Sequence, residues 1–190
     1  MLREMRPTFP MLRSVLALTV TLSATALPSR GIAQSADWSI APQKVGKVTL
    51  GMRVADLYSL YGRQNVRLVD VNGEDDFVPA VQIYLPFEQG SPALVALIAQ
   101  VCGRYRVSGI HVYSARFRTA KGVGVGSSAT EVRRRYDARL TTEEGPVLIV
   151  PALGMSFAVT DGAFGDSTRV VNIWTWSAPA DTSWNRCEKG

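Results

Sequence analysis

Residue types that could carry out chemistry are sparse in this sequence. Its 190 residues contain one histidine, His111, two cysteines, and one acidic run, Glu74-Asp75-Asp76, beside a turn signal. HExxH, CxxC and GxSxG motifs, which would indicate metal, redox or serine-hydrolase chemistry, are all missing from the sequence. A lone histidine on a strand is more often a surface or hydrogen-bonded residue than a base or metal ligand. We therefore expect no enzyme, no cofactor and no metal site.

A glycine-rich segment, Gly122-x-Gly124-x-Gly126-Ser127-Ser128, resembles a phosphate-binding loop because it ends where a helix is expected to begin. The lysine of a Walker motif is missing, and no acidic residue lies in the βαβ context of a dinucleotide site. We therefore favour a structural turn between a strand and a helix.

Basic residues gather between positions 116 and 139. Those that could form an anion or lipid-headgroup site are Arg116, Arg118, Arg133 and Arg134. Glu131 precedes Arg135 by four residues, which is also the pattern of a solvated helix face. The solvated face is the favoured interpretation, and the anion site stays open as the alternative.

The first 33 residues have the pattern of a cleaved signal peptide. Arginines precede an uncharged apolar run from Ser14 to Leu27, which is shorter than the ~20 residues of a membrane-spanning helix. Cleavage after Ala33 or after Ala26 would fit, and we prefer Ala33. Export to the periplasm or the medium follows as the expectation. Residues 34–190 then form one domain, with 17 basic and 15 acidic residues, a balance that does not favour nucleic acid as a partner.

Both cysteines, Cys102 and Cys187, lie in the expected exported part. An oxidising compartment and an even number of cysteines favour a disulfide between them over two unpaired thiols.

An internal repeat indicates how this domain is organised. Val48–Tyr61 aligns with Val123–Tyr136 at a constant offset of 75, so that glycine, acid and tyrosine positions coincide. Each copy predicts a short strand, a Gly turn and a helix, and the second helix has a capping box, Ser128 to Glu131. Strand patterns follow each helix. They cover 66–71, 78–85, 94–102, 107–114, 146–150, 155–160 and 169–177, with turn signals at Asn72-Gly73 and Asp161-Gly162. A helix stays open at 94–102, because Ser91-Pro92 could begin one.

The predicted fold is α+β, with two strand-helix-strands units in one antiparallel sheet and both helices on one face. The halves would span about 38–116 and 117–179, followed by a tail at 180–190. The paired stretches LGMRVADLYSLYG and VGVGSSATEVRRRYD, with YSARFRTAKGVGVGSS between them, resemble the tandem fold of β-lactamase inhibitory proteins and related small outer-membrane assembly lipoproteins. The joining stretch also resembles uncharacterised exported bacterial proteins. The resemblance implies a sheet face that is free to bind a partner protein.

Strand periodicity predicts which residues lie on that face. Val81, Ile83, Ile110, Val112 and Ile173 share one parity and suit the core. Polar aromatic side chains have the opposite parity, and the predicted partner-binding residues are Tyr84, His111, Tyr113, Trp174 and Trp176. The competing interpretation places the tryptophans in a core beneath the C-terminal tail.

The resulting hypothesis is a non-catalytic exported interaction module that binds another envelope protein. A carrier or sensor of a small or anionic ligand at the envelope surface is the alternative, and with it a peripheral contact with the membrane stays open. The sequence does not fix the oligomeric state.

Overall fold

The structure is a computed structural model, and it describes residues 36–72, 77–88, 90–142, 145–160 and 165–177. The chain divides into two units, Met1–Ala33 and Gln34–Gly190, and all described residues belong to the second. The expected signal peptide, the turn signal Asp161-Gly162 and Cys187 lie outside the described residues. Of the turn signal Asn72-Gly73, only Asn72 is described. No helix among the residues described is long and apolar enough to cross a membrane.

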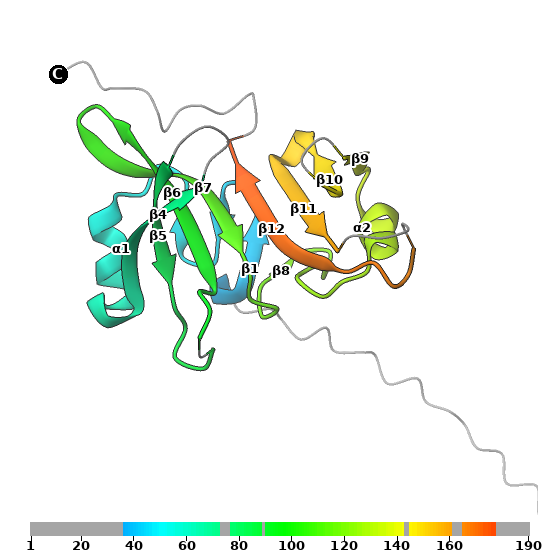
Figure 1. The fold of residues 1–190 in the computed structure, drawn as a ribbon, viewed down its shortest axis with the longest axis horizontal. Helices are drawn as coiled ribbons and strands as arrows, with labels where there is room; N and C mark the ends of the chain where they lie inside the picture. Colours follow the sequence, from blue (N-terminus) through cyan, green and yellow to red (C-terminus); the bar gives the residue numbers. More distant parts are fainter. Residues whose placement is uncertain (1–35, 73–76, 89, 143–144, 161–164, 178–190) are drawn as a thin grey trace, which may run out of the picture. The chain divides into compact units, whose positions relative to one another are not determined.

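An eight-stranded antiparallel sheet dominates this unit (Figure 1). Its strands, in spatial order, are β4 (Val66–Asn72), β5 (Phe77–Ile83), β6 (Leu94–Val101), β7 (Arg104–Val112), β12 (Val170–Trp176), β11 (Met155–Val159), β10 (Val147–Val150) and β9 (Arg139–Thr141). Strands β4 to β7 and strands β9 to β12 each follow one another along the chain, and the two sets join where β7 pairs with β12. The stretch 94–102 is therefore strand rather than helix over most of its length.

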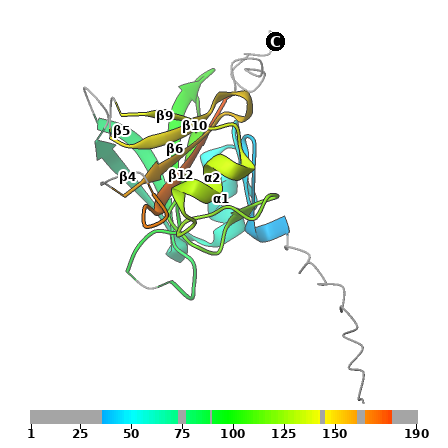
Figure 2. The same cartoon turned by 90° about the vertical axis from the view of Figure 1, so that its right-hand side faces the viewer.

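A second layer covers one side of this sheet. It contains a four-stranded sheet in the order β3 (Val48–Thr49), β2 (Lys44–Val45), β1 (Ser39–Ala41) and β8 (Arg118–Thr119). Two short helices, α1 (Val54–Tyr61) and α2 (Ala129–Arg135), and three 3-10 turns, Ala36–Trp38, Arg63–Asn65 and Pro151–Leu153, complete the secondary structure described. In the side view, β4, β5, β9 and β10 lie to the left of the blue N-terminal strands (Figure 2).

The hydrophobic core lies between these layers. The small sheet contributes Ile40, Val45 and Val48, and the helices contribute Leu57 and Val132, all of them buried. The large sheet contributes the predicted apolar parity, with Val81, Ile83, Ile110, Val112, Phe157 and Ile173 all at 0% exposure. The parity assignment is therefore confirmed for the core side.

The predicted α+β fold of two strand-helix-strands units with both helices on one face is wrong. The described structure is mostly β-sheet. Its main sheet does not contain the short strands that the repeat predicted before each helix. In the first copy that strand, β3, has two residues and pairs with β2 in the small sheet. In the second copy the stretch 123–125 is not a strand, because its amides bond within a turn. A short apolar stretch around glycines has too few residues to show whether it is strand or turn.

Local helix signals were more reliable than the architecture. The Ser128 hydroxyl accepts a hydrogen bond from the amide of Glu131 at 3.1 Å, which confirms the predicted N-cap of α2. Arg53, at the start of α1, makes no such bond and instead forms an ion pair with Asp56 at 2.7 Å. At eight and seven residues, both helices are shorter than the length at which isolated helices are stable, so packing of Leu57 and Val132 into the core must hold them.

Candidate functional site

Aromatic rings form a continuous row on the face of the large sheet opposite the core. His111 on β7 lies directly across from Trp174 on β12, and their rings stack with centroids 5.0 Å apart at 17°. Tyr113 stacks on the other side of His111 at 6.4 Å, and Trp176 tilts against Trp174 at 5.6 Å and 58°. We call these four residues, Tyr113, His111, Trp174 and Trp176, the aromatic ladder.

The alternation of side chains along β7 and β12 produces this ladder. Residues two apart on a strand share a face, so His111 and Tyr113, and likewise Trp174 and Trp176, point to the same side. Antiparallel register then brings the two pairs together. Tyr113 is 44% exposed and Trp174 39% exposed, so the ladder lies at the surface of the described structure.

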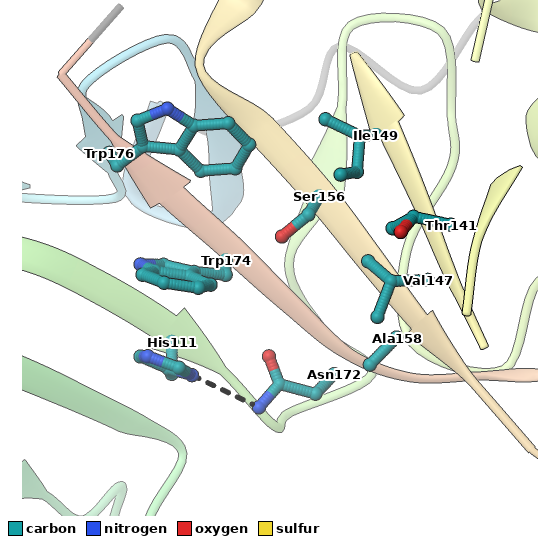
Figure 3. Close-up of a pocket in the computed structure, with 9 residues that line it drawn as sticks. All are labelled: His111, Thr141, Val147, Ile149, Ser156, Ala158, Asn172, Trp174 and Trp176. Carbon is teal, nitrogen blue, oxygen red and sulfur yellow. Dashed lines mark hydrogen bonds between the residues drawn. The ribbon is translucent and has the colours of Figure 1, made fainter. Parts of the chain in front are cut away.

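A hollow of about 490 Å³ lies beside the ladder, over strands β9 to β12 (Figure 3). Nine described residues line it: His111, Thr141, Val147, Ile149, Ser156, Ala158, Asn172, Trp174 and Trp176. None of the nine is acidic or basic apart from His111. Its volume is in the range of sites that bind small molecules or single side chains of a partner.

Asn172 fixes the lower end of the ladder. Its Nδ2 donates to His111 Nδ1 at 3.3 Å, so the imidazole proton must reside on Nε2. The Asn172 Oδ1 then points away from His111 toward the hollow (Figure 3). Burial lowers the pKa of His111 below its ordinary value of 6.5, so the ring is neutral at pH 7. Burial also raises the pKa of Tyr113, and its hydrogen bond with Asn172 partly offsets this.

Two small residues shape the site around Trp174. Ser156, directly across from Trp174 on β11, forms part of the floor of the hollow. Gly109 lies across from Trp176 on β7, and a Cβ there would come within 3.1 Å of the Trp174 Nε1. Glycine at 109 therefore leaves room for the indole in its observed position.

Tyr84, the fifth predicted partner-binding residue, has other contacts. Its hydroxyl donates to Gln82 Oε1 at 2.7 Å, and the guanidinium of Arg67 lies 4.9 Å above its ring. It shares the parity of the ladder but belongs to the β5 side of the sheet.

The candidate anion-binding arginines have separate surroundings. Arg116 lies over the rings of Trp38 and Phe87 and pairs with Glu88 at 3.5 Å. The Nη1 of Arg118 donates to Ser127 Oγ at 3.2 Å. Arg133 and Arg134 are exposed on α2, whereas their neighbour Arg135 pairs with Glu131 at 2.8 Å. The anion site stays a prediction.

The glycine-rich segment uses its amides internally. The amide of Gly122 donates to Thr119 O, that of Gly124 to Ser127 Oγ, and that of Gly126 to Val170 O. Gly126 has φ of 87°, a conformation that glycine adopts without strain. Because a phosphate loop needs free amides that point at the ligand, these bonds support the turn interpretation.

Cys102 is disulfide-bonded, and it lies in the turn between β6 and β7. The other cysteine of the chain, Cys187, is outside the described residues, so the Cys102–Cys187 pairing stays a prediction. Within the part of the chain that is described, no cluster of three or more His, Cys, Asp or Glu side chains could hold a metal ion.

Sequence reasoning missed the wall and floor of the hollow. Ser156, Asn172 and the aliphatic pair Val147 and Ile149 were counted as strand residues without a role. Parity along β12 could have placed Asn172 with Trp174, but the partners of β10 and β11 depend on long-range register.

No protein-family model matches this chain, and no curated protein matches it. A crystal structure of the uncharacterised protein yfeY from Escherichia coli is similar, with a TM-score of 0.52 and 13% sequence identity. The match covers 73% of this chain and 99% of that one, and at this identity it shows a shared fold alone. The resemblance to β-lactamase inhibitory proteins and assembly lipoproteins stays a prediction.

Proposed function

We propose that this chain is an exported, non-catalytic interaction module that binds a partner protein through the aromatic ladder. The observation that carries the proposal is a row of four aromatic side chains in contact, three of them stacked, on one face of a sheet beside a hollow of about 490 Å³. Tryptophan and tyrosine dominate the energetics of protein interfaces because they bury large areas at little conformational cost. The compartment we propose is the bacterial periplasm or the medium.

The contacts around His111 support binding rather than catalysis. Its Nδ1 accepts from an amide that does not titrate, and both neighbouring groups in the row are aromatic rings. Such an imidazole is held in place as part of a stacked surface, and no hydrogen bond from a carboxylate among the described residues prepares it to act as a base. This surface extends past the hollow to Tyr113, which does not line it, so an occupant of the hollow alone would leave Tyr113 uncovered.

Transport of a small uncharged ligand is a second candidate function. The volume of the hollow and its largely apolar lining favour it. Binding that weakens steeply with added salt would instead favour the exposed arginines of α2 as an anion site.

Site-specific photo-crosslinking in living cells tests the proposal. A benzophenone amino acid replaces Tyr113 in the full chain, and in the control it replaces Tyr105, which is 54% exposed near the other end of β7. We expect a discrete crosslinked protein from position 113 that is absent from position 105 and disappears in the Trp174→Ala background. Crosslinks that are equal at both positions, or insensitive to Trp174→Ala, would contradict binding through the ladder.

A further inference from the structure

The Ser156 hydroxyl lines the hollow. Ser156 as a whole is only 5% exposed, so this polar group lies at the bottom of the site. It points into the hollow rather than into the sealed core (Figure 3). A hydroxyl so placed has one donor and two acceptor positions through which it can bind a ligand in the hollow.

The hollow has aromatic side chains on one side and aliphatic ones on the other. The rings of His111 and Trp174 face each other, so their edges rather than their faces border the hollow (Figure 3). Ile149 and Val147 stand on the opposite side. Ring edges carry partial positive charge and attract the face of another aromatic ring in a T-shaped contact. A planar ring between the ladder and the aliphatic wall would make both contacts at once.

Charge narrows the class of ligand further. The lining residues are neutral at pH 7, His111 included, so a charged group in the hollow would lose hydration without gaining a counter-charge. The polar groups that line the hollow are the Ser156 and Thr141 hydroxyls, which donate or accept, and the Asn172 Oδ1, which accepts. They suit a neutral ring that carries a hydrogen-bonding group.

We infer that the hollow beside the ladder holds one tyrosine or tryptophan side chain of the partner protein, whose hydroxyl or indole N–H donates to the Ser156 Oγ. This inference rests on the proposed function. Phenylalanine fits the same walls but makes no hydrogen bond with Ser156, and lysine or glutamate would bring an unpaired charge into the site.

The test is an NMR titration of the purified exported protein with single-residue probes. N-acetyltyrosinamide and N-acetyltryptophanamide are compared with N-acetylphenylalaninamide and N-acetyllysinamide, with the indole N–H of Trp174 as reporter. One neutral hydrogen bond corresponds to roughly a fivefold difference in Kd, so we expect the tyrosine or tryptophan probe to bind about fivefold tighter than the phenylalanine probe. The lysine probe should not shift the Trp174 signal.

Ser156→Ala supplies the matched variant, and Ser59→Ala, on the exposed face of α1, supplies its control. Because the Ser156 hydroxyl lines the hollow rather than the core, its removal should leave thermal stability nearly unchanged. The variant should lose the preference for tyrosine or tryptophan over phenylalanine and keep its affinity for the phenylalanine probe. Equal affinities of the three aromatic probes for the wild-type protein would overturn the inference.

The crosslinking and titration results separate the two proposals. A partner that still crosslinks at position 113 while no aromatic probe shifts Trp174 overturns the ring inference and leaves the proposed function standing. Probes that bind with the expected preference, in cells that yield no crosslinked partner, overturn both the proposed function and the assignment of the ring to a protein.

Discussion

Replacing Trp174 with alanine measures how far the aromatic ladder contributes to folding as well as to binding. Trp174 is 39% exposed, so on the order of 150 Å² of its surface is buried by His111, Trp176 and the sheet. At about 25 cal/mol per Å², and allowing for partial burial in the unfolded chain, Trp174→Ala should lower the free energy of unfolding by about 2 to 3 kcal/mol. For a domain of this size the melting temperature should fall by roughly 5 to 10 °C.

Urea unfolding followed by far-ultraviolet circular dichroism gives this free energy without relying on the deleted indole. Tyr105→Ala, at a more exposed aromatic position on β7, should cost less than about 1 kcal/mol. A loss above about 4 kcal/mol would mean that Trp174 belongs to the core, and a loss below about 0.5 kcal/mol would mean that the stack does not form in solution. Where the variant is still folded, partner binding should weaken by at least about 30-fold.

Four further outcomes follow from the structure. Gly126→Val should cost about 1 to 2 kcal/mol, because φ is 87° there, and added phosphate should not change the thermal shift. Ser128→Ala should lower stability by about 1 kcal/mol through the lost N-cap, measured by urea titration. Thiol labelling of denatured, unreduced protein should modify neither Cys102 nor Cys187, and two labelled cysteines would refute the pairing. Because folding lowers the pKa of His111, the unfolded chain binds its proton more readily, so stability should fall as pH drops below about 6.5 and level off beneath the folded pKa. The His111→Gln variant should lack this step in a series of urea titrations across pH.

Most strands of the main sheet could be predicted, because each shows alternation over five or more residues. The stretch 78–85 corresponds to β5 and 169–177 to β12, with ends that differ by one or two residues. The helical alternative at 94–102 failed because β6 is paired on both sides, by β5 and β7, which buries Leu94, Ala96 and Ile98. Tertiary pairing outweighed a local helix-start signal there.

The small sheet could not be predicted, because each of its four strands has only two or three residues and shows no period. The alignment of Val48 with Val123 suggested two equivalent strands, yet the second position lies in a turn. The ladder could be predicted from the sequence, because alternation along two strands places its members on the same face of the sheet. The Ser156 hydroxyl could not, because its position across from Trp174 follows from a register that no local pattern specifies.

The seam between β7 and β12 has a consequence for the order of folding. Strands β4 to β7 and strands β9 to β12 each follow one another along the chain, so each set closes through contacts nearer in sequence than that of His111 with Asn172, which are 61 residues apart. Because closing a longer loop costs more chain entropy, the seam should form last, and in hydrogen exchange its amides should open first as a unit. The ladder straddles that seam, so it exists only after the two sets of strands have docked. A ligand in the hollow would then bind only after this final folding step. It should slow the separation of β7 from β12 in proportion to the occupancy of the hollow.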